Sequence, residues 1–319
     1  MHVFHDLNEF PADVHGTVAT LGNFDGVHLG HRKIFRALRE EAAALGGNAL
    51  VVTFFPHPLK VLAPERAPRC LVPLEERIRL IQACGIPFIL CLPFTRELAD
   101  LSPRQFVEEV LVARLGIKKV LVGQDFRFGK GRQGDIALLR EMGRTLGFSL
   151  RVIQPLQYRG QQVSSTRVRQ LIEQGRVRES ADLLGRHYGI AGTVIRGDGR
   201  GRTLGFPTAN IETPAELLPP QGVYAVLASL EGEPIPGVAN LGTKPTFPGK
   251  PFSIEAYLFD FDQDIYGKRL RMDFVERIRE ERKFPSVDAL VRQMEIDVRA
   301  ARELLKEEAS KPSMACGHC

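Results

Sequence analysis

The stretch LGNFDGVHLGH, residues 21–31, joins a short apolar run to a segment with apolar residues at helical spacing. The run covers residues 17–22, and the helical spacing extends over residues 31–45. A strand that enters a helix through a glycine-rich turn is typical of a parallel sheet, where such turns lie at the carboxyl ends of the strands and bind nucleotides. The glycines let the backbone approach a phosphate chain, and the start of the helix offers unpaired N–H groups. This stretch therefore predicts a nucleotide-binding α/β domain.

The rest of the N-terminal half repeats this alternation of apolar runs and helical patterns. Strands are predicted at residues 48–54, 87–92, 118–123 and 148–153, and helices at residues 74–83, 102–115 and 135–146. Strands that alternate with helices of about ten residues or more indicate a parallel sheet with helices on both faces. We expect residues 1–186 to form this Rossmann-like domain, ending after two short helices at residues 166–174 and 177–184.

The pattern changes after residue 187. Short runs of alternating hydrophobicity are separated by Gly and Pro turns, at residues 189–195, 222–229, 237–241, 252–259 and 269–275. This pattern indicates a small antiparallel barrel or sandwich, of which we favour the β-barrel. An amphipathic helix is predicted at residues 287–305, so the second domain covers residues 187–306 and a disordered tail covers residues 307–319.

Composition excludes several classes of protein. The 319 residues suffice for two domains with separate cores, and 44% hydrophobic and 25% charged residues are ordinary globular usage. A fibre, a disordered chain and a disulfide-stapled miniprotein are therefore excluded. The net charge of +5 favours anionic partners such as nucleotides and permits nucleic acid without implying it.

The sequence shows neither an export signal nor a membrane span. Residues 1–13 lack a basic region followed by an apolar run, and the apolar stretch at residues 88–94 is short and interrupted by Pro93. Five Cys, several of them near apolar segments, favour reduced thiols in a cytoplasmic protein. Cys316 and Cys319 have the spacing of a redox dithiol but no following helix, so we expect an inert or adventitiously metal-binding tail.

Two polar motifs in the first domain point to a polyphosphate. His28 and His31 are three residues apart, so both can face one ligand and donate to a phosphate that gains negative charge. The alternatives are an accidental pair or a metal-binding pair. Residues 163–169, VSSTRVR, place hydroxyl groups and a helix start before two cations, which suits a triphosphate. By itself that run could also be a capped, solvated helix.

GNFDGVHLGH followed by SSTRVR resembles the nucleotidyltransferase domain of prokaryotic bifunctional riboflavin kinase/FAD synthetases. In that family the two motifs hold ATP while the FMN phosphate attacks its α-phosphate. The resemblance implies that His28 and His31 are catalytic and stabilise the adenylyl group during transfer. The ATP contacts that it implies are Gly22, Asn23, Phe24, His28, His31, Ser164, Ser165, Thr166 and Arg167.

Residues 122–129, VGQDFRFG, also match a segment of that family, which lies beside the flavin and the nucleotide. Asp125 is therefore a candidate FMN-binding residue. The alternative is a turn after a strand, packed by Phe126 and Phe128. The segment is not a phosphate-binding P-loop, because its glycines are one residue too far apart and Gly131 replaces Ser or Thr.

Residues 197–210, GDGRGRTLGFPTAN, carry the strongest motif of the second half. Its glycines suit an anion-binding nest, Arg200 and Arg202 add cations, and Thr208 and Asn210 offer the oxygen ligands that Mg²⁺ prefers. A Gly-rich loop alone would equally suit a plain hairpin turn.

The same run closely resembles the riboflavin kinase signature of that family. The resemblance implies ATP contacts at Gly197, Arg202, Thr208 and Asn210, with Mg²⁺ on the last two. Glu255 aligns with the family's catalytic carboxylate, which accepts a proton from the riboflavin 5′-hydroxyl; the alternative is a Glu on a strand surface. Tyr257 departs from the family's usual His. Arg279 resembles a flavin-binding loop residue, with a surface salt bridge as the alternative.

These motifs lead us to expect a bifunctional enzyme of flavin biosynthesis. The C-terminal domain phosphorylates riboflavin to FMN with ATP, and the N-terminal domain adenylylates FMN to FAD and releases pyrophosphate. A chain with one decayed half is the second hypothesis, which the two complete motif sets disfavour. A nucleic-acid binder is the third, disfavoured because the basic residues are spread along the chain and balanced by acids. We expect riboflavin, FMN and ATP as partners, Mg²⁺ as cofactor, neither nucleic acid nor membrane, and an oligomeric state that stays open.

Overall fold

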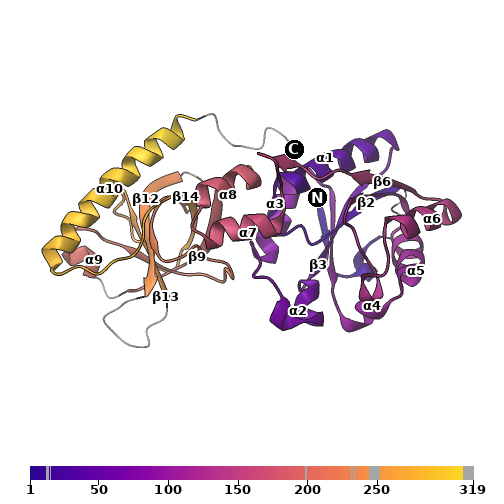
Figure 1. Cartoon of the computed structure of the whole chain (residues 1–319), viewed down its shortest axis with the longest axis horizontal. Coiled ribbons are helices and arrows are strands. Elements are labelled where there is room, and N and C mark those ends of the chain that lie inside the picture. The colour runs from indigo at the N-terminus through magenta and orange to yellow at the C-terminus, as the bar shows by residue number, and fades with distance from the viewer. Residues whose placement is uncertain are drawn as a thin grey trace. The chain divides into compact units, whose positions relative to one another are not determined.

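The computed structural model describes residues 1–11, 14, 16–197, 200–230, 232, 234–243 and 252–311 of the chain, with the backbone alone for Arg200, Arg202 and Thr243. By their contacts these residues form two compact units that divide between Ser164 and Ser165. Figure 1 shows the α/β unit and the barrel unit of the chain. The domain bounds 1–186 and 187–306 stay predictions, because a division by compactness does not fix where a functional domain ends.

A parallel sheet forms the centre of the first unit. Its described strands follow the order β1-β4-β3-β2-β5-β6, and each neighbouring pair is parallel. The strands are β1 (His2–Phe4), β2 (Thr17–Leu21), β3 (Ala49–Phe55), β4 (Phe88–Pro93), β5 (Ile117–Gly123) and β6 (Ser149–Ile153). The prediction of a parallel sheet is confirmed, and the short edge strand β1 adds to it.

Helices cover both faces of this sheet, as predicted (Figure 1). Side chains alternate along each strand, so Val51 packs with the helices α1 and α3 while Val52 packs on the opposite face. The helices of this unit are α1 (Leu29–Ala44), α2 (Pro58–Leu62), α3 (Leu74–Ala83), α4 (Arg96–Asp100), α5 (Pro103–Gln105), the π-helix η3 (Phe106–Arg114) and α6 (Ile136–Leu146). The described residues of this unit also form the short 3₁₀ turns η1 (Leu7–Glu9), η2 (Pro64–Arg66) and η4 (Lys130–Arg132), and a small hairpin joins β7 (Gln157–Tyr158) to β8 (Gln161–Gln162). The helix predicted at residues 102–115 therefore forms with mostly π winding.

The second unit is a closed antiparallel barrel. Its described strands follow the order β10-β13-β12-β11-β14-β9, which leaves no free sheet edge. They are β9 (Tyr188–Ile195), β10 (Ala209–Glu212), β11 (Gly222–Ser229), β12 (Pro234–Thr243), β13 (Phe252–Leu258) and β14 (Arg269–Arg279). The predicted β-barrel is confirmed, and β10 is a strand that its short, polar sequence did not indicate.

Helices pack on the outside of the barrel. The two helices α7 (Ser165–Glu173) and α8 (Val177–Leu184) contact each other, and α8 contacts β9 and β14. A one-turn helix, α9 (Arg200–Thr203), precedes β10.

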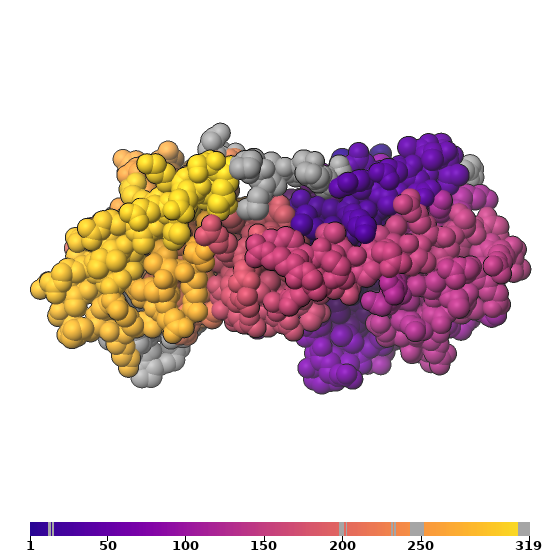
Figure 2. All heavy atoms as spheres, turned by 45° about the horizontal axis from the view of Figure 1, so that its top comes forward, coloured from indigo at the N-terminus to yellow at the C-terminus, as the bar shows by residue number. Residues whose placement is uncertain are grey.

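The C-terminal helix α10 (Val287–Ala309) lies against β11, β12 and β14 through Ala301 and Leu305, and it forms part of the unit's surface (Figure 2). It continues past the predicted start of the tail at residue 307, while residues 312–319, with Cys316 and Cys319, lie outside the described residues. No described helix combines the length and the apolar composition needed to cross a bilayer.

Candidate active sites

The turn between β2 and α1 has a strained backbone. Phe24 and Val27 have φ angles of 46° and 41°, and Gly26 between them has a φ of 79°. A non-glycine residue in this left-handed region costs about 1–3 kcal/mol, and such residues concentrate at functional sites. The surrounding structure therefore holds the predicted nucleotide-binding turn in an unfavourable backbone conformation.

His28 is built into the start of α1. It is the N-cap residue, it is 5% exposed, and its Nδ1 atom accepts a hydrogen bond of 3.3 Å from the His31 N–H. The rings of His28 and His31 are stacked, with centroids 3.6 Å apart and 19° between the planes. The pair predicted to face one ligand therefore lies together at a helix N-terminus, where anions bind.

His31 is a half-buried, neutral ring whose buried Nδ1 atom can bind a ligand. Burial, then the charge of His28 and then that of Arg77 hold the pKa of His31 well below its usual value. Its Nδ1 atom is buried and has no hydrogen-bond partner among the described residues. A buried polar atom without a partner is unusual and points to a ligand that supplies one.

The end of β3 adds polar groups beside this turn. The Asn23 side-chain amide lies 3.0 Å from His57 Nε2, and the Thr53 hydroxyl donates to the Asn23 carbonyl at 3.1 Å. His57 caps α2, because its Nδ1 atom accepts from the Leu59 N–H. We did not predict His57 and Thr53 as site residues, although Thr53 lies at the end of a predicted strand and His57 follows that strand in the same way as the histidine pair follows its own.

The second predicted phosphate motif begins beside α1. A Cβ atom on Gly30 would lie 3.5 Å from the Val163 carbonyl, so the residue before Ser164 lies against the first turn of that helix. Ser165, Thr166 and Arg167 form the first turn of α7, which confirms the predicted helix start. Their contacts with ATP stay predictions.

Asp125 lies exposed in the turn after β5. The Phe126 N–H donates to the Gly123 carbonyl at 3.2 Å, and the Phe126 and Phe128 rings stack with centroids 5.6 Å apart. The packed turn that we considered as the alternative is therefore present, and the FMN contact of Asp125 stays a prediction.

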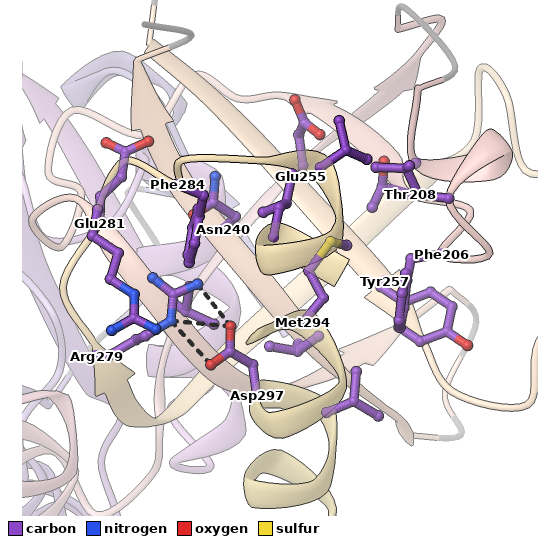
Figure 3. Close-up of a pocket in the computed structure, with 18 of the residues that line it drawn as sticks. Phe206, Thr208, Asn240, Glu255, Tyr257, Arg279, Glu281, Phe284, Met294 and Asp297 are labelled. Carbon is purple, nitrogen blue, oxygen red and sulfur yellow. Dashed lines mark hydrogen bonds and ion pairs between the residues drawn. The ribbon is translucent and has the colours of Figure 1, made fainter. Parts of the chain in front are cut away.

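The second unit contains a cavity of about 750 Å³ between the barrel and the start of α10 (Figure 3). Its lining combines aromatic, apolar and charged side chains. Among them are Phe206, Thr208, Asn240, Glu255, Tyr257, Arg279, Phe284, Met294 and Asp297. A concave site of this volume that mixes apolar walls with a few polar groups suits a small organic substrate.

Glu255 lies in a polar row across three strands. In the strand register it stands opposite Asn210 of β10 on one side and Asn240 of β12 on the other. Residues directly opposite each other point to the same face of a sheet, so the carboxylate lies between two amides. Its neighbours Ile254 and Ala256 are buried on the other face, as the alternation predicted.

The glycine-rich loop lies directly against Thr208 and Asn210. A Cβ atom on Gly197 would come within 2.1 Å of Asn210 Nδ2, and one on Gly201 within 3.0 Å of Thr208 Oγ1. Only glycine permits this approach. Gly197 therefore lies against Asn210, with which we grouped it, and Gly201 lies against Thr208. The side chains of Arg200 and Arg202, and so the predicted ATP contact of Arg202, lie outside the described residues.

Arg279 forms part of the cavity wall through an ion pair with Asp297 of α10. Its Nε atom lies 3.0 Å from each carboxylate oxygen, and an Nη atom lies 2.7 Å from Oδ2 (Figure 3). Asp297 is 3% exposed and also accepts from Gln293, whereas the Arg279 side chain is 19% exposed, so the salt bridge of our alternative is present and the flavin contact of Arg279 stays a prediction. The sequence did not indicate Asp297, because only the packing of α10 brings it to Arg279.

Comparisons with known proteins match the two units in order. The FAD synthetase family matches residues 10–167, and the riboflavin kinase family matches residues 184–305. A bifunctional riboflavin kinase/FMN adenylyltransferase of Escherichia coli K12 is 40% identical over 300 residues, which are 94% of this chain and 95% of that protein. The Pseudomonas fluorescens protein of the same name is 39% identical over 312 residues, 98% of this chain and all of that one.

A solved structure is also similar to this chain. It is a crystal structure of a macrolide-efflux protein from Streptococcus pneumoniae, with a TM-score of 0.84 and 29% identity, and the match covers 94% of this chain and 98% of that one.

Proposed function

This chain belongs to the family of bifunctional riboflavin kinase/FMN adenylyltransferases, and we propose an assignment of its two reactions to its residues. It phosphorylates riboflavin to FMN with ATP and adenylylates FMN to FAD, releasing pyrophosphate. The kinase reaction belongs to the barrel unit and the adenylyl transfer to the α/β unit, in the order of the two family matches.

Glu255 is the catalytic base of the kinase reaction. The observation that carries this assignment is the row of Asn210, Glu255 and Asn240 across three strands, of which Glu255 and Asn240 line the cavity. Glu255 accepts the proton of the riboflavin 5′-hydroxyl as that oxygen attacks the γ-phosphorus of ATP, and the bond to the leaving ADP oxygen breaks. The two amides orient the carboxylate, and the Arg279–Asp297 pair, with Phe284 5.6 Å from the guanidinium, forms the flavin side of the cavity.

Thr208 and Asn210 would hold Mg²⁺. Hydroxyl and amide oxygens are hard ligands, and the close approach of Gly197 and Gly201 brings the loop backbone to both side chains. When bound, Mg²⁺ neutralises charge on the triphosphate. Among the described residues no group of three His, Cys, Asp or Glu side chains forms an alternative metal site.

His28 and His31 are the catalytic residues of adenylyl transfer. An FMN phosphate oxygen attacks the α-phosphorus of ATP, and the bond to pyrophosphate breaks. The histidine pair at the N-terminus of α1 donates hydrogen bonds to the charge that develops on the α-phosphate, and the lowered pKa of His31 keeps that ring neutral. The remaining ATP contacts are Gly22, Asn23, Phe24, Ser164, Ser165, Thr166 and Arg167, and Asp125 contacts FMN.

We also propose a reducing, cytoplasmic setting. Cys70, Cys84 and Cys91 are thiols rather than disulfides, and burial raises the pKa of Cys91 to about 11.

Chromatography of riboflavin incubated with the full-length chain, ATP and Mg²⁺ tests the two activities. We expect FMN to appear first and FAD to follow, and neither product to form when a chelator removes Mg²⁺. Folded protein that forms no FMN from riboflavin and no FAD from added FMN would contradict the proposed function.

A further inference from the structure

Asp25 lies between Phe24 and Val27 in the strained turn and connects that turn to a distant segment. Its carboxylate is 2% exposed, and its two oxygens accept hydrogen bonds of 3.0 and 2.9 Å from the Leu71 N–H. The Val72 N–H donates to Oδ1 at 3.4 Å. The turn is therefore fastened at its middle to the segment before α3.

Arg77 of α3 extends this connection to β3. Its guanidinium is buried, and it reaches Asp25 Oδ1 at 4.0 Å, the Thr53 hydroxyl at 3.4 Å and the Phe54 carbonyl at 3.3 Å. The Thr53 hydroxyl in turn donates to the Asn23 carbonyl at 3.1 Å. The buried Arg77 side chain therefore connects the turn after β2, through Asp25, to the end of β3, through Thr53 and Phe54.

The charge of Arg77 also acts on the histidine pair. After burial and the charge of His28, Arg77 is the third cause that lowers the pKa of His31. The groups that face the His31 ring are His28 stacked on it and Phe24, whose ring lies edge-on with centroids 5.2 Å apart. Asp25, next to Arg77, is the nearby carboxylate that offsets part of this charge.

We propose that Arg77 is a positioning residue for adenylyl transfer, which holds the strained turn carrying His28 through Asp25 and the end of β3. This inference rests on the proposed roles of His28 and His31. Arg77 acts through these residues and does not touch the substrates. A sequence-based assignment passes over it, because it lies on a helix outside the glycine-rich motif.

The test compares Arg77→Met with Arg77→Lys in the full-length chain. The Met variant removes the charge and every hydrogen bond, whereas Lys keeps a charge but loses the planar fork. We expect kcat for FMN adenylylation to fall by about tenfold to a hundredfold in the Met variant, because small displacements of catalytic groups have effects of this size. The KM for ATP changes little, and Lys restores part of the rate.

The pH profile separates positioning from a loss of fold. Without the Arg77 charge, His31 takes up a proton at higher pH, so the acid limb of kcat moves to higher pH in the Met variant and stays in place in the Lys variant. Riboflavin phosphorylation by the same molecules serves as the internal control and stays unchanged. Arg79→Met, an exposed position on the same helix, is the matched control and leaves both reactions unchanged.

Arg77→Met leaves the buried Asp25 carboxylate without its cation, which could prevent folding. The double variant Asp25→Asn with Arg77→Met removes both charges and so avoids this problem. We expect it to fold and to keep the low adenylylation rate. A wild-type rate and pH profile in this double variant, or in folded Arg77→Met, would overturn the inference. Should the double change His28→Ala with His31→Ala leave adenylylation intact, the proposed function itself would fail instead.

Discussion

The two proposed sites gather their reactive groups in different ways. In the α/β unit, His28 and His31 come from one short stretch, and a strained turn places them at the start of α1. In the barrel unit, Asn210, Glu255 and Asn240 come from three strands, and antiparallel register places them side by side. The first site therefore depends on the conformation of one loop, whereas the second depends on register and on the packing of α10. Changes at each site should affect one reaction and spare the other.

Glu255→Gln should have the largest effect. The amide keeps the size of the side chain but cannot accept the hydroxyl proton, so riboflavin phosphorylation should fall by about 10²–10⁴-fold. Conversion of added FMN to FAD should continue at the wild-type rate. Initial rates of both reactions check this, with Glu295→Gln, an exposed position on α10, as the matched control.

The double change His28→Ala with His31→Ala should impair adenylyl transfer and spare the kinase reaction. Loss of preorganised donors should lower FMN adenylylation by about 10²–10³-fold, and riboflavin phosphorylation should stay unchanged. His5→Ala, at an exposed position of the same unit, is the control. A loss of both reactions in folded protein would mean that the two sites are not separate.

Gly197→Ala should have a smaller effect, confined to the kinase reaction. The new methyl group would come within 2.1 Å of Asn210 Nδ2 and displace that amide from the loop. We expect riboflavin phosphorylation to fall by about tenfold, the lower end of what a displaced active-site group produces. Steady-state kinetics at varied Mg²⁺ check this, and an unchanged rate would show that Asn210 tolerates the displacement.

The smallest expected effect is on stability, through His31. Its lowered pKa means that the unfolded chain binds a proton here more readily than the folded one. The resulting stabilisation is complete above a pH of about 6.5 and is lost as the pH falls from there towards the folded-state pKa, by at most about 1.4 kcal/mol per pH unit. Denaturant unfolding of the α/β unit at about pH 7.5 and 5.5 measures it. His31→Asn should reduce the change in unfolding free energy between these two pH values. An unchanged pH dependence in this variant would contradict a neutral His31 ring.

Features that depend on neighbouring residues in the chain could be predicted from the sequence. The alternation of apolar runs predicted the parallel sheet, and the spacing of His28 and His31 predicted that they share one helix start. Contacts between segments that are far apart in the sequence could not be predicted in this way. Asp297 reaches Arg279 only because α10 packs on the barrel, and Arg77 reaches Asp25 only because α3 covers the sheet. Strand β10 escaped prediction because register with β9 and β13, rather than its own hydrophobic pattern, makes it a strand.

One mixing experiment tests the central claim, that this chain carries two independent sites that act in sequence. Glu255→Gln and the His28→Ala, His31→Ala variant are incubated with riboflavin, ATP and Mg²⁺, separately and together, and the flavins are separated by chromatography. We expect almost no FAD from Glu255→Gln alone, FMN with almost no FAD from the histidine variant alone, and FAD from the mixture. Formation of FAD from riboflavin by either variant alone, at the wild-type rate, would contradict it.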